Sequence, residues 1–152
     1  MSALQIGDFD PRDTDALVAM WRASFEHGVG IVDPHPIAEQ VAFFQREVLP
    51  RHRVRVARRD GGELLGFIAA NRESVSQLHV RVEHIGHGIG ARLLDAAKAA
   101  SGGSLWLYTF ARNTRACRFY ERQGFTAVAR GFEPTWQLDD VRYEWTRHET
   151  AP

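Results

Sequence analysis

The segment His84-Ile85-Gly86-His87-Gly88-Ile89-Gly90-Ala91 (HIGHGIGA) leads directly into the amphipathic run ARLLDAAKAA, which is typical of a helix. Glycine costs backbone entropy on folding, so three glycines in such a short stretch need a reason. The first amides of a helix have no partner inside the helix, and the helix dipole adds partial positive charge there. Because glycines let a ligand approach those amides closely, the segment predicts an anion site that best suits a phosphate.

Three interpretations of this glycine loop are open. It can be a purely structural turn. The pattern Gly86-x-Gly88-x-x-Ala91 also fits the dinucleotide-binding fingerprint, which requires an acidic residue at the end of the next strand. The next predicted strand ends at Tyr108-Thr109-Phe110 without a carboxylate, which disfavours that interpretation. The third interpretation, a loop for the pyrophosphate of coenzyme A, depends on a resemblance that a second segment supports.

Apolar periodicity around the loop predicts the element order β-α-α-β-β-β-α-β-α-β-β. Strands are expected at residues 4–9, 53–58, 64–70, 75–82, 104–110, 125–130 and 141–146. Helices are expected from residue 10 to about 25, 36 to about 48, 88 to 100 and 113 to 123, with a loop at 26–35. The β-α-β crossover from 75 to 110 makes its two strands parallel neighbours. The expected class is α/β, with helices on a mixed (α+β) sheet.

Composition limits the class of protein. The 152 residues are 44% hydrophobic and 25% charged, as expected for one domain over residues 1–152. Nineteen basic and 19 acidic side chains give zero net charge, so no global basic field favours a nucleic-acid partner. The single cysteine, Cys117, allows no intramolecular disulfide, and no apolar run approaches the ~18 residues of a membrane span. We expect a cytoplasmic protein without a membrane partner.

Two segments together resemble the GNAT superfamily of acetyl-CoA-dependent N-acetyltransferases. Residues 77–94 (QLHVRVEHIGHGIGARLL) look like its acyl-CoA motif, and residues 113–125 (NTRACRFYERQGF) are similar to its N-x-x-A-x-x-F-Y-x-x-x-G-F pattern. Gly88 and Gly90 match the loop pattern Q/R-x-x-G-x-G/A, whereas Ile85 stands where the family has Gln or Arg. We expect this departure to weaken a side-chain contribution while the backbone amides keep the phosphate site.

The resemblance implies the GNAT fold, in which the strands matching 75–82 and 104–110 splay apart around the pantetheine arm of acetyl-CoA. Backbone groups of Leu78, His79 and Val80 would pair with that arm as with an added strand. The loop residues expected to hold the phosphates are Ile85, Gly86, His87, Gly88, Ile89, Gly90 and Ala91. On the next helix Asn113, Ala116 and Phe119 are expected to contact the cosubstrate. Asn113 equally suits the helix N-cap, and both roles can coexist.

The resemblance also implies direct attack of an amine on the thioester. Tyr120 matches the family's tyrosine, and a phenol of pKa ~10 can donate to a thiolate whose conjugate acid is near ~8.5. Its helical spacing also suits a packed aromatic. An amine of pKa ~10 is almost fully charged at neutral pH and needs a base. Glu26 is the preferred candidate for that base, and His27, His79 and Glu83 are alternatives.

Further candidates are weighed against plainer roles. Three histidines, at 79, 84 and 87, lack the second cysteine or spaced carboxylates of a metal site, so no metal is expected. Cys117 has no His–Asp constellation around it and is read as an inert helix residue. Trp136 lies in a polar loop near Asp139 and Asp140 (EPTWQLDD), where it can receive a cation or anchor the loop.

From these observations we expect an N-acetyltransferase that acts on a primary amine of a small molecule in a ternary complex. Two alternatives stay open, a protein or peptide N-acetyltransferase and a non-catalytic acyl-CoA sensor. The expected partners are acetyl-CoA and the acceptor amine, and a homodimer is possible.

Overall fold

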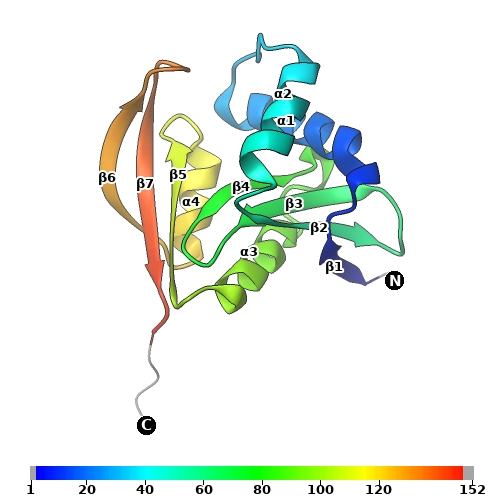
Figure 1. Ribbon diagram of the computed structural model, residues 1–152. Helices are drawn as coiled ribbons and strands as arrows, with labels where there is room; N and C mark the ends of the chain where they lie inside the picture. The colour runs from blue at the N-terminus through cyan, green and yellow to red at the C-terminus, as the bar shows by residue number, and fades with distance from the viewer. Residues whose placement is uncertain (1–2, 149–152) are drawn as a thin grey trace.

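The computed structural model describes residues 3–148, which form two antiparallel sheets and the helices packed on them (Figure 1). The first sheet has the order β1-β2-β3-β4, with β1 (Leu4–Asp8), β2 (Arg53–Arg59), β3 (Leu64–Ala70) and β4 (Val75–Val80). The second has the order β5-β7-β6, with β5 (Ser104–Phe110), β7 (Leu138–Thr146) and β6 (Thr126–Glu133). The helices are α1 (Thr14–Val29), α2 (Ile37–Phe43), α3 (Ile89–Ala100) and α4 (Thr114–Arg122).

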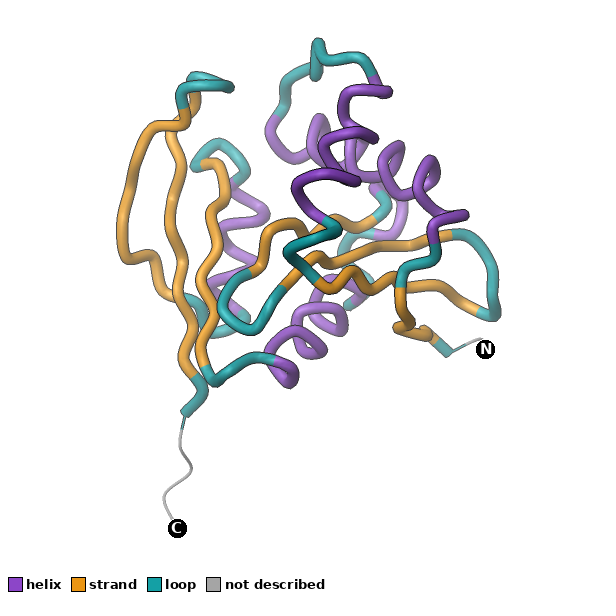
Figure 2. Tube along the Cα trace, viewed as in Figure 1, coloured by secondary structure: helices purple, strands orange, loops and turns teal. Residues whose placement is uncertain are grey.

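Helices cover both faces of the first sheet (Figure 2). Helix α1 and the π-helical segment Phe44–Val48, which continues α2, pack one core cluster, including Leu17 and Phe44, against Phe67 of β3. Helix α3 packs a second cluster, including Leu93, against Ile68 and against the second sheet. Strand β3 is buried along its whole length because its sequence, LLGFIAA, is entirely apolar and suits a strand covered on both faces.

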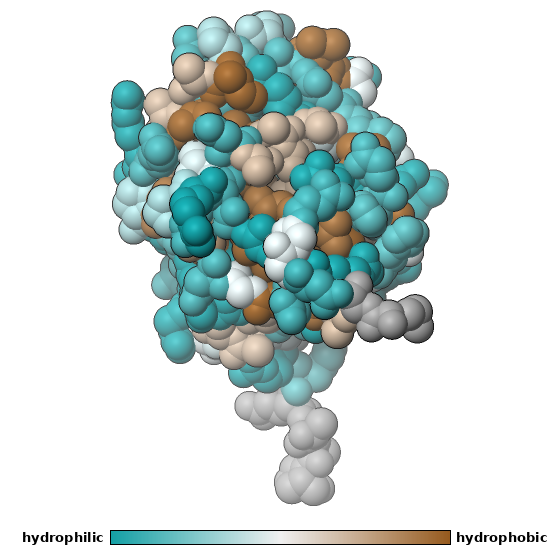
Figure 3. Space-filling model, turned by 90° about the vertical axis from the view of Figure 1, so that its right-hand side faces the viewer, coloured by the Kyte–Doolittle hydropathy of each residue, from teal (hydrophilic) through white to brown (hydrophobic). Residues whose placement is uncertain are grey.

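The distribution of polar and apolar side chains on the surface is typical of a folded domain. The face on the β1 side is mainly hydrophilic and carries hydrophobic residues in separate patches (Figure 3). Scattered patches of this kind are normal on an exposed surface. None of the helices within residues 3–148 combines the length and the apolar composition that crossing a membrane requires.

The parallel pairing expected between residues 75–82 and 104–110 is not confirmed. Strand β5 pairs along its length with β7, from Ser104 opposite Thr146 to Phe110 opposite Asp140. Its ladder pairing with the β4 region within the described chain is limited to one parallel bridge between Ser74 and Trp106, beside which the Trp106 amide donates to the Glu73 carbonyl at 3.0 Å. The expected mixed sheet is therefore two antiparallel sheets that meet at this bridge, and β4 and β5 diverge from it.

Helix α1 is longer than expected. The helix expected to end near residue 25 continues to Val29, where Gly30 takes a left-handed φ of 78° and its amide donates to the Glu26 carbonyl at 2.9 Å. Glu26 therefore lies in the last helical turn, and the expectation that it belongs to a loop is wrong. Strands β6 and β7 are also longer than expected, so the connection that carries Trp136 is a short turn.

Gly66 sets the distance between α3 and the first sheet. A Cβ at this position would lie 3.0 Å from the His79 carbonyl oxygen and 3.1 Å from side-chain carbons of both Ile89 and Leu93. These distances are tighter than nine in ten real Cβ contacts, and the position is buried. Only glycine lets the helix approach the strand this closely.

Replacing Gly66 with alanine is expected to lower the free energy of unfolding by about 1–3 kcal/mol, because the added methyl overpacks a rigid core. Urea denaturation followed by circular dichroism measures this change. Gly7→Ala in β1 is the matched control, since a Cβ there meets nothing within 4 Å. Equal denaturation midpoints for the two variants would contradict the packing role of Gly66.

Candidate active site

One cavity of about 1400 Å³ lies where β4 and β5 diverge. At one end its wall is formed by the loop before α3 and the start of α4. At the other end the wall is formed by α1, the loop that follows it and the turn between β6 and β7. The cavity thus extends from the glycine loop to a second end lined by aromatic and acidic residues, including Phe25, Trp136, Asp33 and Asp140. We call this the acceptor end.

The backbone of the glycine loop is open to a ligand. Gly86 and Gly88 have left-handed φ angles of 89° and 83°, and a Cβ at either would meet nothing within 4 Å. Helix α3 begins at Ile89 with Gly88 at its N-cap, where no side chain caps the helix. The first backbone N–H groups of α3 are therefore available to donate to an anion, which can enter the space that side chains would otherwise fill.

Gly90 has a different role from the other two loop glycines. A Cβ there would lie 3.3 Å from the ring of Phe119, so this glycine lets α3 pack close to α4. Of the loop residues expected to bind the cosubstrate, His87 does not line the cavity, whereas the others do: Ile85, Gly86, Gly88, Ile89, Gly90 and Ala91.

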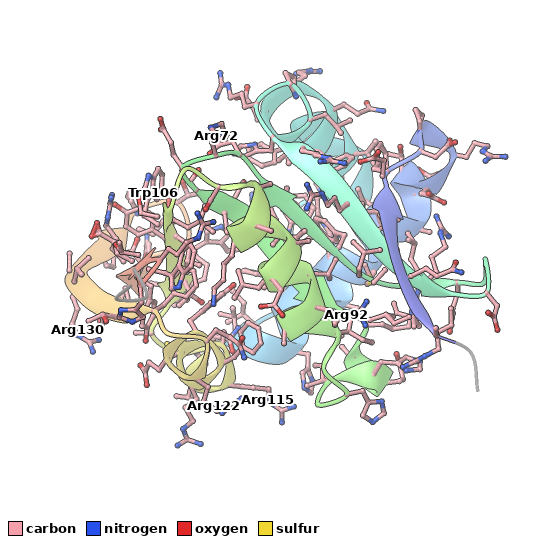
Figure 4. The ribbon with its side chains drawn as sticks, turned by 90° about the horizontal axis from the view of Figure 1, so that it is seen from below. Arg72, Arg92, Trp106, Arg115, Arg122 and Arg130 are labelled. Atoms are coloured by element: carbon pink, nitrogen blue, oxygen red, sulfur yellow. The ribbon has the colours of Figure 1, made fainter. Side chains whose placement is uncertain are left out.

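A buried nitrogen at the loop fits an anionic ligand. The Nδ1 atom of His84 is buried and has no hydrogen-bond partner within the described part of the chain. An unpaired buried polar atom is costly, and His84 also lines the cavity, so a ligand that supplies a hydrogen-bonding group at this ring would satisfy it. Arg115 and Arg122 also line the cavity and extend from α4 (Figure 4). The residues present therefore fit a phosphate-bearing cosubstrate.

The start of α4 is organised by Asn113. Its side-chain oxygen accepts a hydrogen bond from the Ala116 amide at 3.1 Å, which caps the helix. Its amide nitrogen faces Gly28 of α1, where a Cβ would lie only 2.5 Å away. Asn113, Ala116 and Phe119 all line the cavity.

Tyr120 packs in the core and also lines the cavity. Its ring lies 5.7 Å from that of Phe125 and 6.0 Å from that of Tyr143, and 7% of the residue is exposed. Burial raises the pKa of the Tyr120 phenol, and the neighbouring Cys117 adds to this effect. The hydroxyl therefore keeps its proton at neutral pH and can donate it.

Strand β4 presents both a backbone edge and a buried histidine. Leu78, His79 and Val80 line the cavity, and β4 pairs with β3 on its other side. His79 accepts from the Ser24 hydroxyl at Nδ1 (3.1 Å) and donates to the Gln77 side-chain oxygen from Nε2 (3.0 Å). Burial lowers the pKa of His79 to about 3, so its ring is neutral with both nitrogens engaged.

Glu26 supports the loop after α1. Its carboxylate accepts a hydrogen bond from the Asp33 amide at 2.6 Å, and neither Glu26 nor Glu83 is among the described residues that line the cavity. His27, the other candidate in this helical turn, does line it. The structure therefore brings Tyr120 and His27 to the cavity and leaves the two carboxylates outside it.

Aromatic rings and carboxylates gather at the acceptor end. The ring of Phe25 lies 4.9 Å from that of Trp136 and 6.1 Å from that of Phe110. Trp136 also anchors its turn, because its backbone amide donates to the Glu133 carboxylate at 2.6 Å. The carboxylates that line this end belong to Asp33, Glu39, Glu133 and Asp140. This combination suits a cation.

Comparison with known proteins adds a family match. The model of the acetyltransferase (GNAT) domain family matches residues 50–127. No curated protein sequence matches this chain.

Similar solved structures extend over nearly the whole chain. The apo form of YjaB from Escherichia coli has a TM-score of 0.79 at 19% identity and covers 96% of this chain and 99% of its own. An acetyltransferase from Thermus thermophilus has a TM-score of 0.75 at 23% identity, with coverage of 96% and 99%. The yncA protein of Salmonella typhimurium, solved with its cofactor acetyl-CoA, has a TM-score of 0.68 at 20% identity, with coverage of 99% and 97%. At these identities the likeness shows the fold.

Proposed function

The chain belongs to the GNAT acetyltransferase family, and from this premise we propose that it moves the acetyl group of acetyl-CoA to a primary amine of a small molecule. The observation that carries the proposal is the open backbone at Gly86 and Gly88, which lies at one end of a cavity that also contains Tyr120. Phosphate recognition and a proton donor in one continuous space are what acyl transfer from a phosphate-bearing thioester requires.

In this proposal the cosubstrate lies along the divergence of β4 and β5. The pyrophosphate binds the first amides of α3 and the free Nδ1 of His84. The pantetheine arm pairs with the edge of β4 at residues 78–80, which satisfies backbone groups that the first sheet leaves open on this side. The thioester then lies between this strand and Tyr120.

The reaction proceeds by direct attack within the ternary complex. The neutral amine nitrogen forms a bond to the acetyl carbon, the carbon–sulfur bond breaks, and its electron pair goes to sulfur. Tyr120 donates its proton to that thiolate, and the acetylated nitrogen releases its surplus proton to restore the phenol. Burial raises the pKa of the phenol, which keeps its O–H present as a hydrogen-bond donor to the thiolate and makes Tyr120 a weaker acid than a free phenol.

The acceptor end supports a small cationic amine. Phe25 and Trp136 offer ring faces to an ammonium group, and Asp33, Glu133 and Asp140 lower the cost of placing its charge there. An acceptor bound at this end approaches the thioester from the side opposite the glycine loop.

The test is release of the coenzyme A thiol from acetyl-CoA, measured with a thiol reagent against aliphatic, aromatic and diamine acceptors and against peptides with free N-termini. Release that depends on a small amine supports the proposal. Release with peptides alone would replace the small-molecule acceptor by a peptide. Acetyl-CoA binding by calorimetry without release for any acceptor would favour the sensor and overturn the proposed reaction.

A further inference from the structure

A buried carboxylate and a histidine form a hydrogen-bonded pair in the loop after α1. The Oδ1 atom of Asp33 accepts from the His35 backbone amide at 2.9 Å and pairs with Nδ1 of the His35 ring at 2.7 Å. The Asp33 side chain is only 8% exposed, and its other oxygen lies 3.5 Å from a guanidinium nitrogen of Arg22. The positions of both side chains are therefore fixed by several contacts.

Helix α1 holds this loop in place. Arg22 donates to the His35 carbonyl at 2.5 Å and to the Gln40 side chain at 3.0 Å, and Glu26 accepts from the Asp33 amide at 2.6 Å. The backbone on both sides of the ring is thus fixed to the same helix. His35 has a defined position although it lies outside regular secondary structure.

The ring of His35 belongs to the acceptor end of the cavity. It lies edge-on to Trp136, with ring centroids 5.2 Å apart at 75°, and both residues line the cavity. Because the Asp33 carboxylate can only accept, Nδ1 of the neutral ring carries the proton and Nε2 keeps a free lone pair. Within the described residues, Nε2 has no hydrogen-bond partner.

We propose that His35 is the base that removes a proton from the acceptor ammonium and that Asp33 positions it. This inference rests on the proposed function and assigns the proton acceptor that the reaction needs. Nε2 takes one proton from the ammonium directly or through one water, the neutral amine attacks the thioester, and the imidazolium later releases that proton to solvent. Asp33 fixes the ring tautomer and stabilises the imidazolium, as a buried carboxylate does in hydrolase triads.

Charged side chains from several elements line the cavity together with His35. From α1 it meets Arg22 and Glu26 beside Asp33, while Glu39 of α2, Glu133 of β6 and Asp140 of β7 line the same part of the cavity, as does His27.

Asp33 itself stays charged at neutral pH. Burial acts to raise the pKa of its carboxyl, but hydrogen bonds from the backbone and ring of His35 and the charge of Arg22 outweigh burial and lower it. The carboxylate is thus available to hold the ring throughout the range in which a histidine base works.

The other candidates for the base are less well placed. Both ring nitrogens of His79 are engaged, and the carboxylate of Glu26 is used by the loop backbone. His27 lines the cavity, but no carboxylate of the described residues holds its ring. His27 is the matched comparison for His35, because both histidines line the cavity and only His35 is paired with a carboxylate.

The test compares His35→Gln with His27→Gln, using the small amine that supports the fastest thiol release. We expect His35→Gln to lower kcat about 10²-fold at neutral pH, with KM for acetyl-CoA unchanged. Across about pH 5 to pH 9 the acidic limb of the wild-type profile that reports a histidine should disappear in this variant. His27→Gln should keep that limb, whatever its effect on kcat, because the limb identifies which of the two histidines is the base.

Chemical rescue separates a proton acceptor from a structural residue. Added imidazole should restore part of the lost rate to His35→Ala and leave the wild type unchanged. Asp33→Asn should lower kcat and shift the acidic limb while retaining it. A wild-type profile in His35→Gln, loss of the limb in His27→Gln, or absence of imidazole rescue in a folded His35→Ala protein would overturn the inference while the acetyltransferase assignment stands. Absence of thiol release with every amine would overturn both.

Discussion

Replacing Tyr120 with phenylalanine is expected to lower kcat for amine acetylation by about 10²–10³-fold and to leave acetyl-CoA binding unchanged. The phenylalanine ring keeps the contacts with Phe125 and Tyr143, so the core around it stays packed. Only the hydroxyl is lost, and it makes no hydrogen bond to another described side chain. The departing thiolate then has no donor, so the barrier rises at the step in which the carbon–sulfur bond breaks. Thiol release and calorimetry with acetyl-CoA measure the two quantities.

Tyr143→Phe is the control for this expectation. Tyr143 is equally buried and lies beside Tyr120, but its hydroxyl donates to the Glu121 carboxylate at 2.6 Å. Its loss should reduce the free energy of unfolding by about 1 kcal/mol while kcat stays near the wild-type value. An unchanged kcat in Tyr120→Phe, or an equal loss in both variants, would show that Tyr120 acts only through packing.

Local signals in the sequence predicted the parts of the fold that depend on neighbouring residues. The glycines before α3, the cap residue Asn113 and the apolar spacing of both helices are features of short segments, and the structure has these helices where they were expected. Strand pairing is different, because residues far apart in the sequence decide it. The pattern of residues 104–110 shows a buried strand without showing that its partner is β7.

The end of α1 shows how a local signal can mislead. Two glycines, at 28 and 30, and Pro34 favour a loop over residues 26–35, yet the helix continues through Gly28 to Val29. A glycine suits residue 28 because the side chain of Asn113, the N-cap of α4, occupies the space that a Cβ would take. That requirement comes from a helix more than 80 residues away in the sequence, so local reasoning had no access to it.

The pair of Asp33 and His35 was also missed, although part of its signal is local. An aspartate whose side chain accepts from the amide two residues later forms a common turn, and Asp33-Pro34-His35 fits that spacing. The sequence does not show that Arg22 holds the loop or that Trp136 meets the ring, since both contacts depend on the tertiary fold. Functional residues on a loop can be predicted only when the elements that hold the loop in place are known.

Replacing Gly88 with valine is expected to weaken acetyl-CoA binding about 100-fold, which corresponds to losing about 3 kcal/mol of hydrogen bonding to a charged group. The valine side chain would fill the space in front of the first amides of α3, where nothing now lies within 4 Å. A branched residue also disfavours the left-handed φ of 83°, so the substitution strains the backbone as well. The binding measurement must therefore be separated from the loss of stability.

Gly61→Val makes that separation. Gly61, in the turn between β2 and β3, has a left-handed φ of 67° and equally open space at its Cβ, and it does not line the large cavity. Both variants should lose a similar amount of stability, about 1–3 kcal/mol, because the backbone strain is of the same kind. Calorimetric titration with acetyl-CoA, at a temperature where both proteins are folded, should show weaker binding for Gly88→Val alone. Equal acetyl-CoA affinities for the two variants would mean that residue 88 has no special role in binding and that the phosphates lie elsewhere. A deficit confined to residue 88 would locate them at the start of α3, because open space in front of unpaired helix amides is what distinguishes that glycine from Gly61.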